Sequence, residues 1–257
     1  MFKDSFTAVA DGAVGKIGKL RSDPLAYFLL SMLAGAYIGF GVLLAFTLGG
    51  AMTGTAGMKL TMGATFGVAL SLVVMAGAEL FTGNNLAMAA GMLQKKVTLA
   101  DSVLLWIVCW LGNLAGAVLL SFIYYGTGLY TDATLACITG AAVTKMTAGP
   151  LQLLTRGILC NMLVCIAVWC AAKLQSEAGK LIIIFWCLLA FFSTGFEHSV
   201  ANMTTLTLSL LDHGGNSAIT VAGYFYNLGL VTLGNMIGGI LLVAVPYYMA
   251  GRDRKKA

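Results

Sequence analysis

The chain has 257 residues, of which 59% are hydrophobic and 10% carry charge, and its mean hydropathy is +0.90. Because a soluble domain carries about 25% charged residues, this composition excludes an ordinary water-soluble protein and makes lipid the natural solvent. The length fits one compact membrane domain, and the 32 glycines suit helices that pack closely through small residues.

The first 24 residues differ from the rest of the chain. They mix polar and apolar residues and lack the roughly 7–15-residue apolar core of a signal peptide. We interpret residues 1–24 as a cytoplasmic amphipathic segment, 25–249 as a six-span transport domain and 250–257 as a basic cytoplasmic tail.

Six apolar stretches follow, each reaching the roughly 20 residues that cross the hydrocarbon core. Pro24 and Pro150 stand just ahead of the first and the fourth, at a position where a helix tolerates proline. The sequence therefore predicts an all-α membrane protein with six transmembrane helices, at residues 25–49, 60–93, 102–125, 151–172, 181–211 and 219–249.

Basic residues set the expected orientation, because cytoplasmic loops carry an excess of Lys and Arg. With both termini in the cytoplasm, the far side holds only Lys59 and Lys145, with Arg156 just inside the fourth span. We therefore expect a multi-pass protein of a bacterial-type inner membrane. The remaining basic residues gather on the cytoplasmic side: Lys3, Lys16, Lys19, Arg21, Lys95, Lys96, Lys173, Lys180, Arg252, Arg254, Lys255 and Lys256.

The second and fifth stretches are too long for one crossing, and each has a carboxylate and small polar residues near its middle, at 77–85 and 195–202. An uninterrupted helix would leave these groups facing lipid, which is costly. A break is allowed where the backbone lines a cavity. We therefore predict broken second and fifth helices.

The two breaks resemble each other. Both carry Gly-x-Glu-x-x-x-x-Asn, and each is followed by Leu-Gly-Asn-x-x-Gly in the next span. Three spans per half is an odd number, so the second half must enter the membrane from the opposite side. The sequence thus predicts an inverted 3+3 repeat, which points to a binding site near the midplane. The repeated residues are Gly77, Glu79, Asn84 and Asn113 in one half, and Gly195, Glu197, Asn202 and Asn235 in the other.

His198 is the central candidate for function, since an ionisable residue within the membrane is functional by default. It can change charge near neutral pH and could donate a proton or a hydrogen bond in a pore. The alternative is a neutral histidine bonded to a helix backbone. The other histidine, His213, lies in a polar loop.

Glu79 and Glu197 either line an ion path or tie together the ends of broken helices, and we favour the second because ionised carboxylates would repel anions. Thr82 and Asn161 either meet a substrate or link helices. Lys145 and Arg156 either reach the membrane interface or form an electropositive funnel for anions. The asparagines near the breaks resemble helix-bridging amides: Asn84, Asn113, Asn202 and Asn235.

Other classes of protein fit less well. No paired Asn-Pro-Ala box of an aquaporin is present, only one histidine is embedded where an ammonium channel would need two, and an ATP-binding motif is lacking. No CxxC or Cys/His cluster favours a metal. We expect no enzyme, no metal, no cofactor and no nucleic-acid partner.

Three motifs resemble those of the formate–nitrite transporter family: residues 74–83 (VMAGAELFTG), 157–164 (GILCNMLV) and 196–203 (FEHSVANM). With the six-span layout they cover nearly the whole chain. The resemblance implies an aquaporin-like fold, a homo-pentamer with one pore per protomer, and transport of small monovalent anions such as nitrite, formate or hydrosulfide, with possible proton coupling.

By the same resemblance, His198 is the pore histidine, Thr82 a pore hydroxyl, Asn161 its partner and Lys145 a lysine of the outer vestibule. The short tail and the run at 185–191 favour nitrite, whereas the loop at 82–85 suits hydrosulfide. The anion crosses either as a neutral acid after taking a proton near His198, or unprotonated past a cationic His198. The resemblance also implies a cytoplasmic constriction at Phe66, Leu70 and Leu80, and a periplasmic one at Phe191 and Val164.

Overall fold

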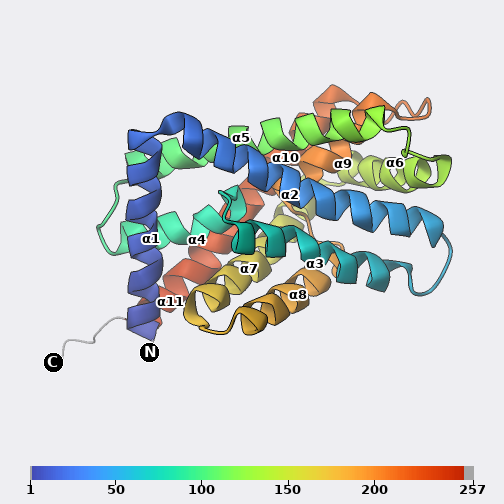
Figure 1. Ribbon diagram of the computed structural model, residues 1–257. Coiled ribbons are helices and arrows are strands. Elements are labelled where there is room, and N and C mark those ends of the chain that lie inside the picture. The colour runs from blue at the N-terminus through green and yellow to red at the C-terminus, as the bar shows by residue number, and fades with distance from the viewer. Residues whose placement is uncertain (1, 252–257) are drawn as a thin grey trace.

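The computed structural model describes residues 2–251, and within them every regular element is a helix (Figure 1). The predicted basic tail, 250–257, therefore lies outside the described residues except for Ala250 and Gly251. In chain order the elements are α1 (Phe2–Ser22), α2 (Pro24–Ala51), α3 (Met58–Ala76), α4 (Phe81–Leu93), α5 (Leu99–Gly126), α6 (Asp132–Thr147), α7 (Pro150–Lys173), α8 (Glu177–Thr194), α9 (Ser199–Leu211), α10 (Val221–Gly239), the π-helix η1 (Ile240–Ala244) and α11 (Val245–Gly251).

Six helices of the described chain are long and apolar enough to cross a membrane: α2, α3, α5, α7, α8 and the continuous run from α10 through α11. This confirms the prediction of an all-α protein with six spans. The surface of these helices carries large apolar side chains such as Leu119, Phe122 and Ile123, each more than half exposed. Lipid solvates such side chains without penalty, so the composition and the surface agree.

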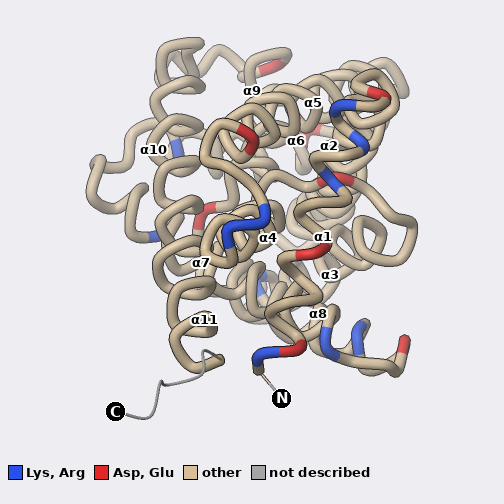
Figure 2. The backbone as a smooth tube through the Cα atoms, turned by 90° about the vertical axis from the view of Figure 1, so that its left-hand side faces the viewer, with Lys and Arg blue, Asp and Glu red and all other residues tan. Residues whose placement is uncertain are grey.

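The helices α1 and α6 lie at the two ends of the bundle, outside the six candidate spans (Figure 1). In Figure 1, α1 crosses one end of the bundle and α6 lies at the opposite end. Figure 2 shows that charged residues are sparse along the spans and recur along α1. Ion pairs from Asp11 to Lys96, which lies between α4 and α5, and from Arg21 to Asp101 in the first turn of α5 hold α1 against this part of the bundle. The sequence predicts only a polar connection between the spans at 102–125 and 151–172, whereas the structure has α6 there, whose 16 residues are too few to cross.

The chain leaves helical geometry inside the second and fifth apolar stretches. Gly77 (φ +78°) follows α3 and Gly195 (φ +81°) follows α8, both in the left-handed region that ends helices at little cost for glycine. Helical structure resumes only at Phe81 and Ser199. The Gly-x-Glu motif thus has a local cause, because the glycine turns the chain and the glutamate lies within the short non-helical segment that follows.

The sixth span is interrupted in a different way. Pro246 has no N–H to donate and its ring crowds the carbonyl four residues earlier, so the ladder cannot continue as a regular α-helix. The turn before it widens into η1, where the Val245 N–H bonds the Ile240 carbonyl.

Glycines let the spans pack backbone against backbone. A Cβ at Gly35 would meet the Asn113 carbonyl oxygen at 2.0 Å, and one at Gly238 would meet the Ile158 carbonyl oxygen at 2.2 Å. These contacts lie within one chain, between α2 and α5 and between α7 and α10. The other small-residue pairs, Gly63/Gly67, Gly112/Gly116 and Gly234, also face helices of the same chain.

Candidate functional site

His198 and Thr82 meet at the centre of the molecule. The His198 Nε2 lies 3.1 Å from the Thr82 Oγ1, although 116 positions separate them in the sequence. Their side chains come from the first turn of α4 and the residue that caps α9, and both are buried. The His198 ring also stacks on the Phe191 ring, with centroids 5.8 Å apart.

The backbone fixes the tautomer of His198. The Ala201 N–H donates to Nδ1 at 3.1 Å, so Nδ1 acts as an acceptor and carries no proton. The proton of the neutral ring is then on Nε2, which donates to the Thr82 hydroxyl. A second proton would have to displace the helix cap and would place a cation at the positive N-terminal end of α9. The geometry therefore supports a neutral ring and leaves the Thr82 hydroxyl proton free for another acceptor.

Asn161 of α7 lies behind this pair. Its Nδ2 donates to the Thr82 carbonyl at 3.3 Å and to the Asn235 carbonyl at 2.6 Å. Asn161 thus joins the backbone of α4 to that of α10 and supports Thr82 through its main chain, not through its hydroxyl.

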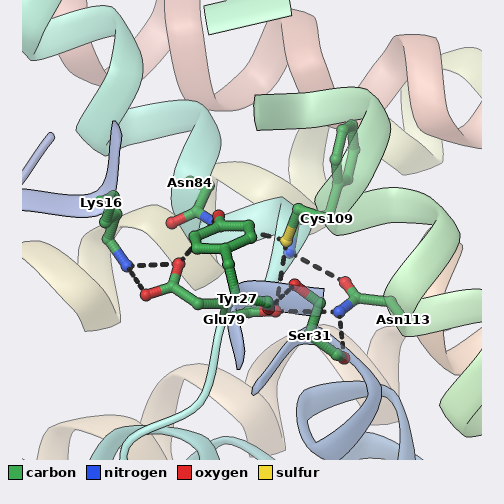
Figure 3. A network of polar contacts seen from close by, with 8 residues as sticks. Lys16, Tyr27, Ser31, Glu79, Asn84, Cys109 and Asn113 are labelled. Carbon is green, nitrogen blue, oxygen red and sulfur yellow. Dashed lines mark hydrogen bonds and ion pairs between the residues drawn. The ribbon is translucent and has the colours of Figure 1, made fainter. Parts of the chain in front are cut away.

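Glu79 anchors the segment before α4 (Figure 3). Its carboxylate accepts from Lys16 Nζ at 2.7 Å, from Asn84 Nδ2 at 2.9 Å and from the Tyr27 hydroxyl at 3.1 Å. Lys16 comes from α1 and Tyr27 from α2, so this carboxylate joins three helices. The network also reaches Cys109, whose thiol donates to the Glu79 carbonyl at 3.2 Å.

Glu197 occupies the matching place before α9. Its carboxylate accepts from Lys145 Nζ at 2.9 Å and from Asn202 Nδ2 at 2.6 Å. Asn202 also donates to the Asn227 amide oxygen at 2.8 Å, and Asn227 in turn donates to the Lys145 carbonyl at 3.0 Å. Lys145 is the last-turn residue of α6.

Two further asparagines clamp the same segments, and we call them the amide clamps. Asn113 accepts from the Phe81 N–H at 2.9 Å and donates to the carbonyls of Glu79 and Ser31. Asn235 accepts from the Ser199 N–H at 2.9 Å and donates to the carbonyls of Glu197 and Gly157. Each clamp satisfies the backbone groups that an interrupted helix leaves without partners.

A cavity opens at each side of the central pair. The α6-side cavity has a volume of about 490 Å³, and His198, Lys145, Glu197, Arg156 and Lys59 are among its lining residues. The α1-side cavity has a volume of about 280 Å³ and is lined by Lys16, Glu79, Asn84 and apolar residues that include Leu70 and Leu80.

Apolar side chains close the space between the two cavities. Phe66, Leu70, Val164 and Phe191 surround His198 with no room for a water molecule. Phe66 packs edge-on against Phe191, with ring centroids 5.6 Å apart. Phe66, expected at the cytoplasmic constriction, therefore shares one apolar cluster with both residues expected at the periplasmic one.

Sequence reasoning missed three partners: Lys16, Tyr27 and Asn227. Lys16 had been considered only as a basic residue of the N-terminal segment. The signal that could have found it is the repeat itself, since Lys16 precedes Pro24 much as Lys145 precedes Pro150. Among the described residues, no group of three His, Cys, Asp or Glu side chains could hold a metal ion.

Six membrane-spanning helices around a buried polar pair with a cavity on each side define a multi-pass membrane channel or transporter. The family model described as "Formate/nitrite transporter" matches residues 3–249. The chain belongs to the formate/nitrite transporter family.

Relatives agree along nearly their whole lengths. The chain is 40% identical over 252 residues to the nitrite transporter NirC of Salmonella typhimurium, covering 97% of this chain and 92% of the relative. It is 39% identical over 269 residues to a probable formate transporter of Methanothermobacter thermautotrophicus, covering 95% and 97%.

Solved structures give the same result. An FNT family ion channel superposes with a TM-score of 0.92 at 38% identity, covering 96% of this chain and 98% of that one. A pentameric formate channel with formate bound superposes with a TM-score of 0.77 at 28% identity, covering 88% and 96%. These relatives are transporters and channels, not enzymes.

Proposed function

We propose that this protein passes small monovalent weak-acid anions, nitrite foremost, across the inner membrane. The observation that carries the proposal is the buried Thr82–His198 pair between two cavities that each contain a lysine. The identity to NirC favours nitrite over formate and hydrosulfide, which would use the same pore.

The membrane arrangement belongs to the same proposal. Each half would consist of one short helix, one span, one broken span and one further span, with α3–α4 and α8–α9 as the broken spans. The matching partners of Glu79 and Glu197 support an inverted 3+3 repeat of aquaporin-like form. The α1 side would face the cytoplasm with both termini. Residues 1–24 would lie at that surface, 25–249 would form the transport domain, and 250–257 would extend into the cytoplasm.

The chain would act as a homo-pentamer with a pore in each protomer. The pentameric title of one structural neighbour supports this assembly. Apolar side chains exposed on the single chain would then be shared between lipid and neighbouring protomers.

The mechanism follows from the dry apolar cluster. A bare anion entering the space around Phe66 and Phe191 would lose its hydration, which costs several kcal/mol or more. Two groups at the centre offset that cost, because His198 Nε2–H fixes the Thr82 hydroxyl and this hydroxyl can donate to the anion. With His198 neutral, the ring orients the donor, and a proton that crosses with the anion comes from the cavity water.

The amides and carboxylates would serve the scaffold. Glu79, Glu197, Asn84, Asn202 and the two amide clamps would hold the non-helical segments, while Asn161 would support Thr82. The neutralised carboxylates would leave the anion free to approach.

The test is anion current across a planar bilayer that contains the purified protein, beside His198→Asn and Thr82→Val. Wild type should carry nitrite, formate and hydrosulfide, with nitrite carried best. Both variants should lower the current at least ~10-fold or alter its pH dependence. A wild type that carries no anion, or variants with unchanged current and pH profile, would overturn the proposal. Swelling of proteoliposomes in neutral polyols would instead favour an aquaporin-like solute channel.

A further inference from the structure

Arg156 is a cation of the α6-side cavity that the network above does not use. It lies in the second turn of α7 and lines the cavity together with His198 and Lys145. Its own carbonyl accepts the Glu197 N–H at 3.3 Å, so its backbone is fixed directly beside the segment that carries His198. A hydrogen bond therefore holds the backbone that carries the guanidinium next to the His198 segment.

The guanidinium itself has no side-chain partner within the described residues. No ion pair or hydrogen bond joins it to an acidic group, whereas Lys145 Nζ is bonded to Glu197. The cavity lining holds three cations, Lys59, Lys145 and Arg156, against the single carboxylate of Glu197. Arg156 is thus a partly buried positive charge with five N–H donors that lines this cavity.

The other half of the molecule shows that the fold does not need this charge. The Glu79 N–H donates to the Leu30 carbonyl at 3.2 Å, and Asn113 bonds the next carbonyl, that of Ser31. The Glu197 N–H and Asn235 make the same two bonds to Arg156 and Gly157. Leu30 and Arg156 therefore occupy equivalent positions, and an apolar side chain suffices at one of them.

We propose that Arg156 is a selectivity-determining subsite that binds planar anions with two oxygens, such as nitrite and formate, in the α6-side cavity before they reach Thr82. A guanidinium presents two parallel N–H donors that match two oxygens on one atom, a geometry that an ammonium group cannot offer. A spherical anion such as chloride is stabilised only by attraction to the positive charge. This subsite deepens the proposed function and rests on it.

The subsite works by raising the local concentration of planar two-oxygen anions in the α6-side cavity. Lys145 and Lys59 attract every anion alike, since a point charge does not distinguish shape. Arg156 adds a preference by shape, and it does so on one side only, because Leu30 at the equivalent position lines no cavity on the α1 side.

The experiment compares wild type with Arg156→Lys and Arg156→Leu, using the permeability ratios of nitrite to chloride and formate to chloride from reversal potentials. Arg156→Lys keeps the charge and should lower both ratios about 5- to 20-fold. Arg156→Leu should lower them as much and also lower the current of every anion. The control, Lys59→Gln, removes a charge from the same cavity and should lower all currents while leaving the ratios unchanged.

Unchanged ratios in Arg156→Lys, beside a wild type that conducts nitrite, would overturn the subsite and leave the proposed function standing. A second measurement does not depend on transport: modification of Arg156 by phenylglyoxal, followed by mass spectrometry of its peptide. Sodium formate should slow that modification at least ~3-fold relative to equal sodium chloride. Equal rates in the two salts would also overturn the proposal.

Discussion

The two halves of the molecule share one scaffold and differ in what they present at the entrances. Glu79 and Glu197 are held by the same set of contacts: a lysine from a non-spanning helix, an asparagine five residues later and an amide clamp. The residues around this set diverge. The comparison teaches that the clamps stabilise the fold in both halves, whereas the residues beside them give the two cavities different charges and hydrogen-bonding groups.

The α6 side carries more positive charge than the α1 side. On the α1 side the third partner of the carboxylate is the Tyr27 hydroxyl, and the cavity lining carries one cation and one carboxylate. On the α6 side Asn227 bonds Asn202 and not the carboxylate, and two further cations line the cavity. The Glu197 side chain is 4% exposed, against 15% for Glu79, so the second ion pair is also the less screened.

The largest expected effect comes from breaking a clamp. Asn113→Ala and Asn235→Ala each remove three hydrogen bonds and leave a buried N–H and two carbonyls without that partner. Each should cost about 4 kcal/mol of stability, seen as a large loss of melting temperature in detergent. Asn216→Ala, in the loop before α10, is the matched control with a small effect. If the two clamps differed widely, the shared scaffold would be the wrong description.

A smaller effect should separate the halves. Glu197→Gln leaves Lys145, whose side chain is 17% exposed, without a counter-charge and should cost about 3 kcal/mol, while Glu79→Gln should cost about 1 kcal/mol because Lys16 is more exposed, at 28%. Thermal unfolding of both variants measures this. Replacing Lys145 by Met in the Glu197→Gln background should recover part of the loss. Equal costs in the two single variants would contradict the difference in screening.

The smallest effect is at the start of α2. Asp23 caps this helix with a charged side chain, whereas the equivalent helix α7 begins after Gly149 and has no side-chain cap. The Ala26 N–H and Lys19 lower the pKa of the Asp23 carboxyl below its ordinary value. A lowered pKa means that Asp23 adds stability above the unfolded value of about 3.9, and that this contribution disappears as the pH falls through the folded value. Asp23→Asn keeps a capping group and should flatten that acid limb slightly. If the melting temperature fell identically with pH in both proteins, Asp23 would not be a cause of the loss of stability at acid pH.

The spans and the central residues could be predicted because their signals are local. Six apolar runs and a histidine inside one of them are visible in short windows of sequence. The partners of Glu79 have no such local signal, since Lys16 lies 63 positions away, and only a comparison of the two halves of the sequence could have pointed to it. Helix α6 was missed because a short helix of mixed polarity looks like a loop when only membrane-length runs are sought.

Other features depend on packing that no local pattern encodes. The contact between Phe66 and Phe191 arises because α3 and α8 lie side by side, which joins two groups of residues that the resemblance assigns to separate constrictions. The sequence likewise does not indicate that Arg156 lacks an acidic partner, because this follows only from the structure, in which Glu197 is bonded to Lys145.

The origin of Lys16 gives α1 a second effect beyond covering one end of the bundle. Removal of the residues before Asp23 would widen access to the α1-side cavity and would also take away the only lysine that pairs with Glu79 among the described contacts. The widened mouth would then carry an unbalanced negative charge. A shortened protein should therefore admit anions more slowly at low ionic strength, and added salt should restore the rate by screening that charge.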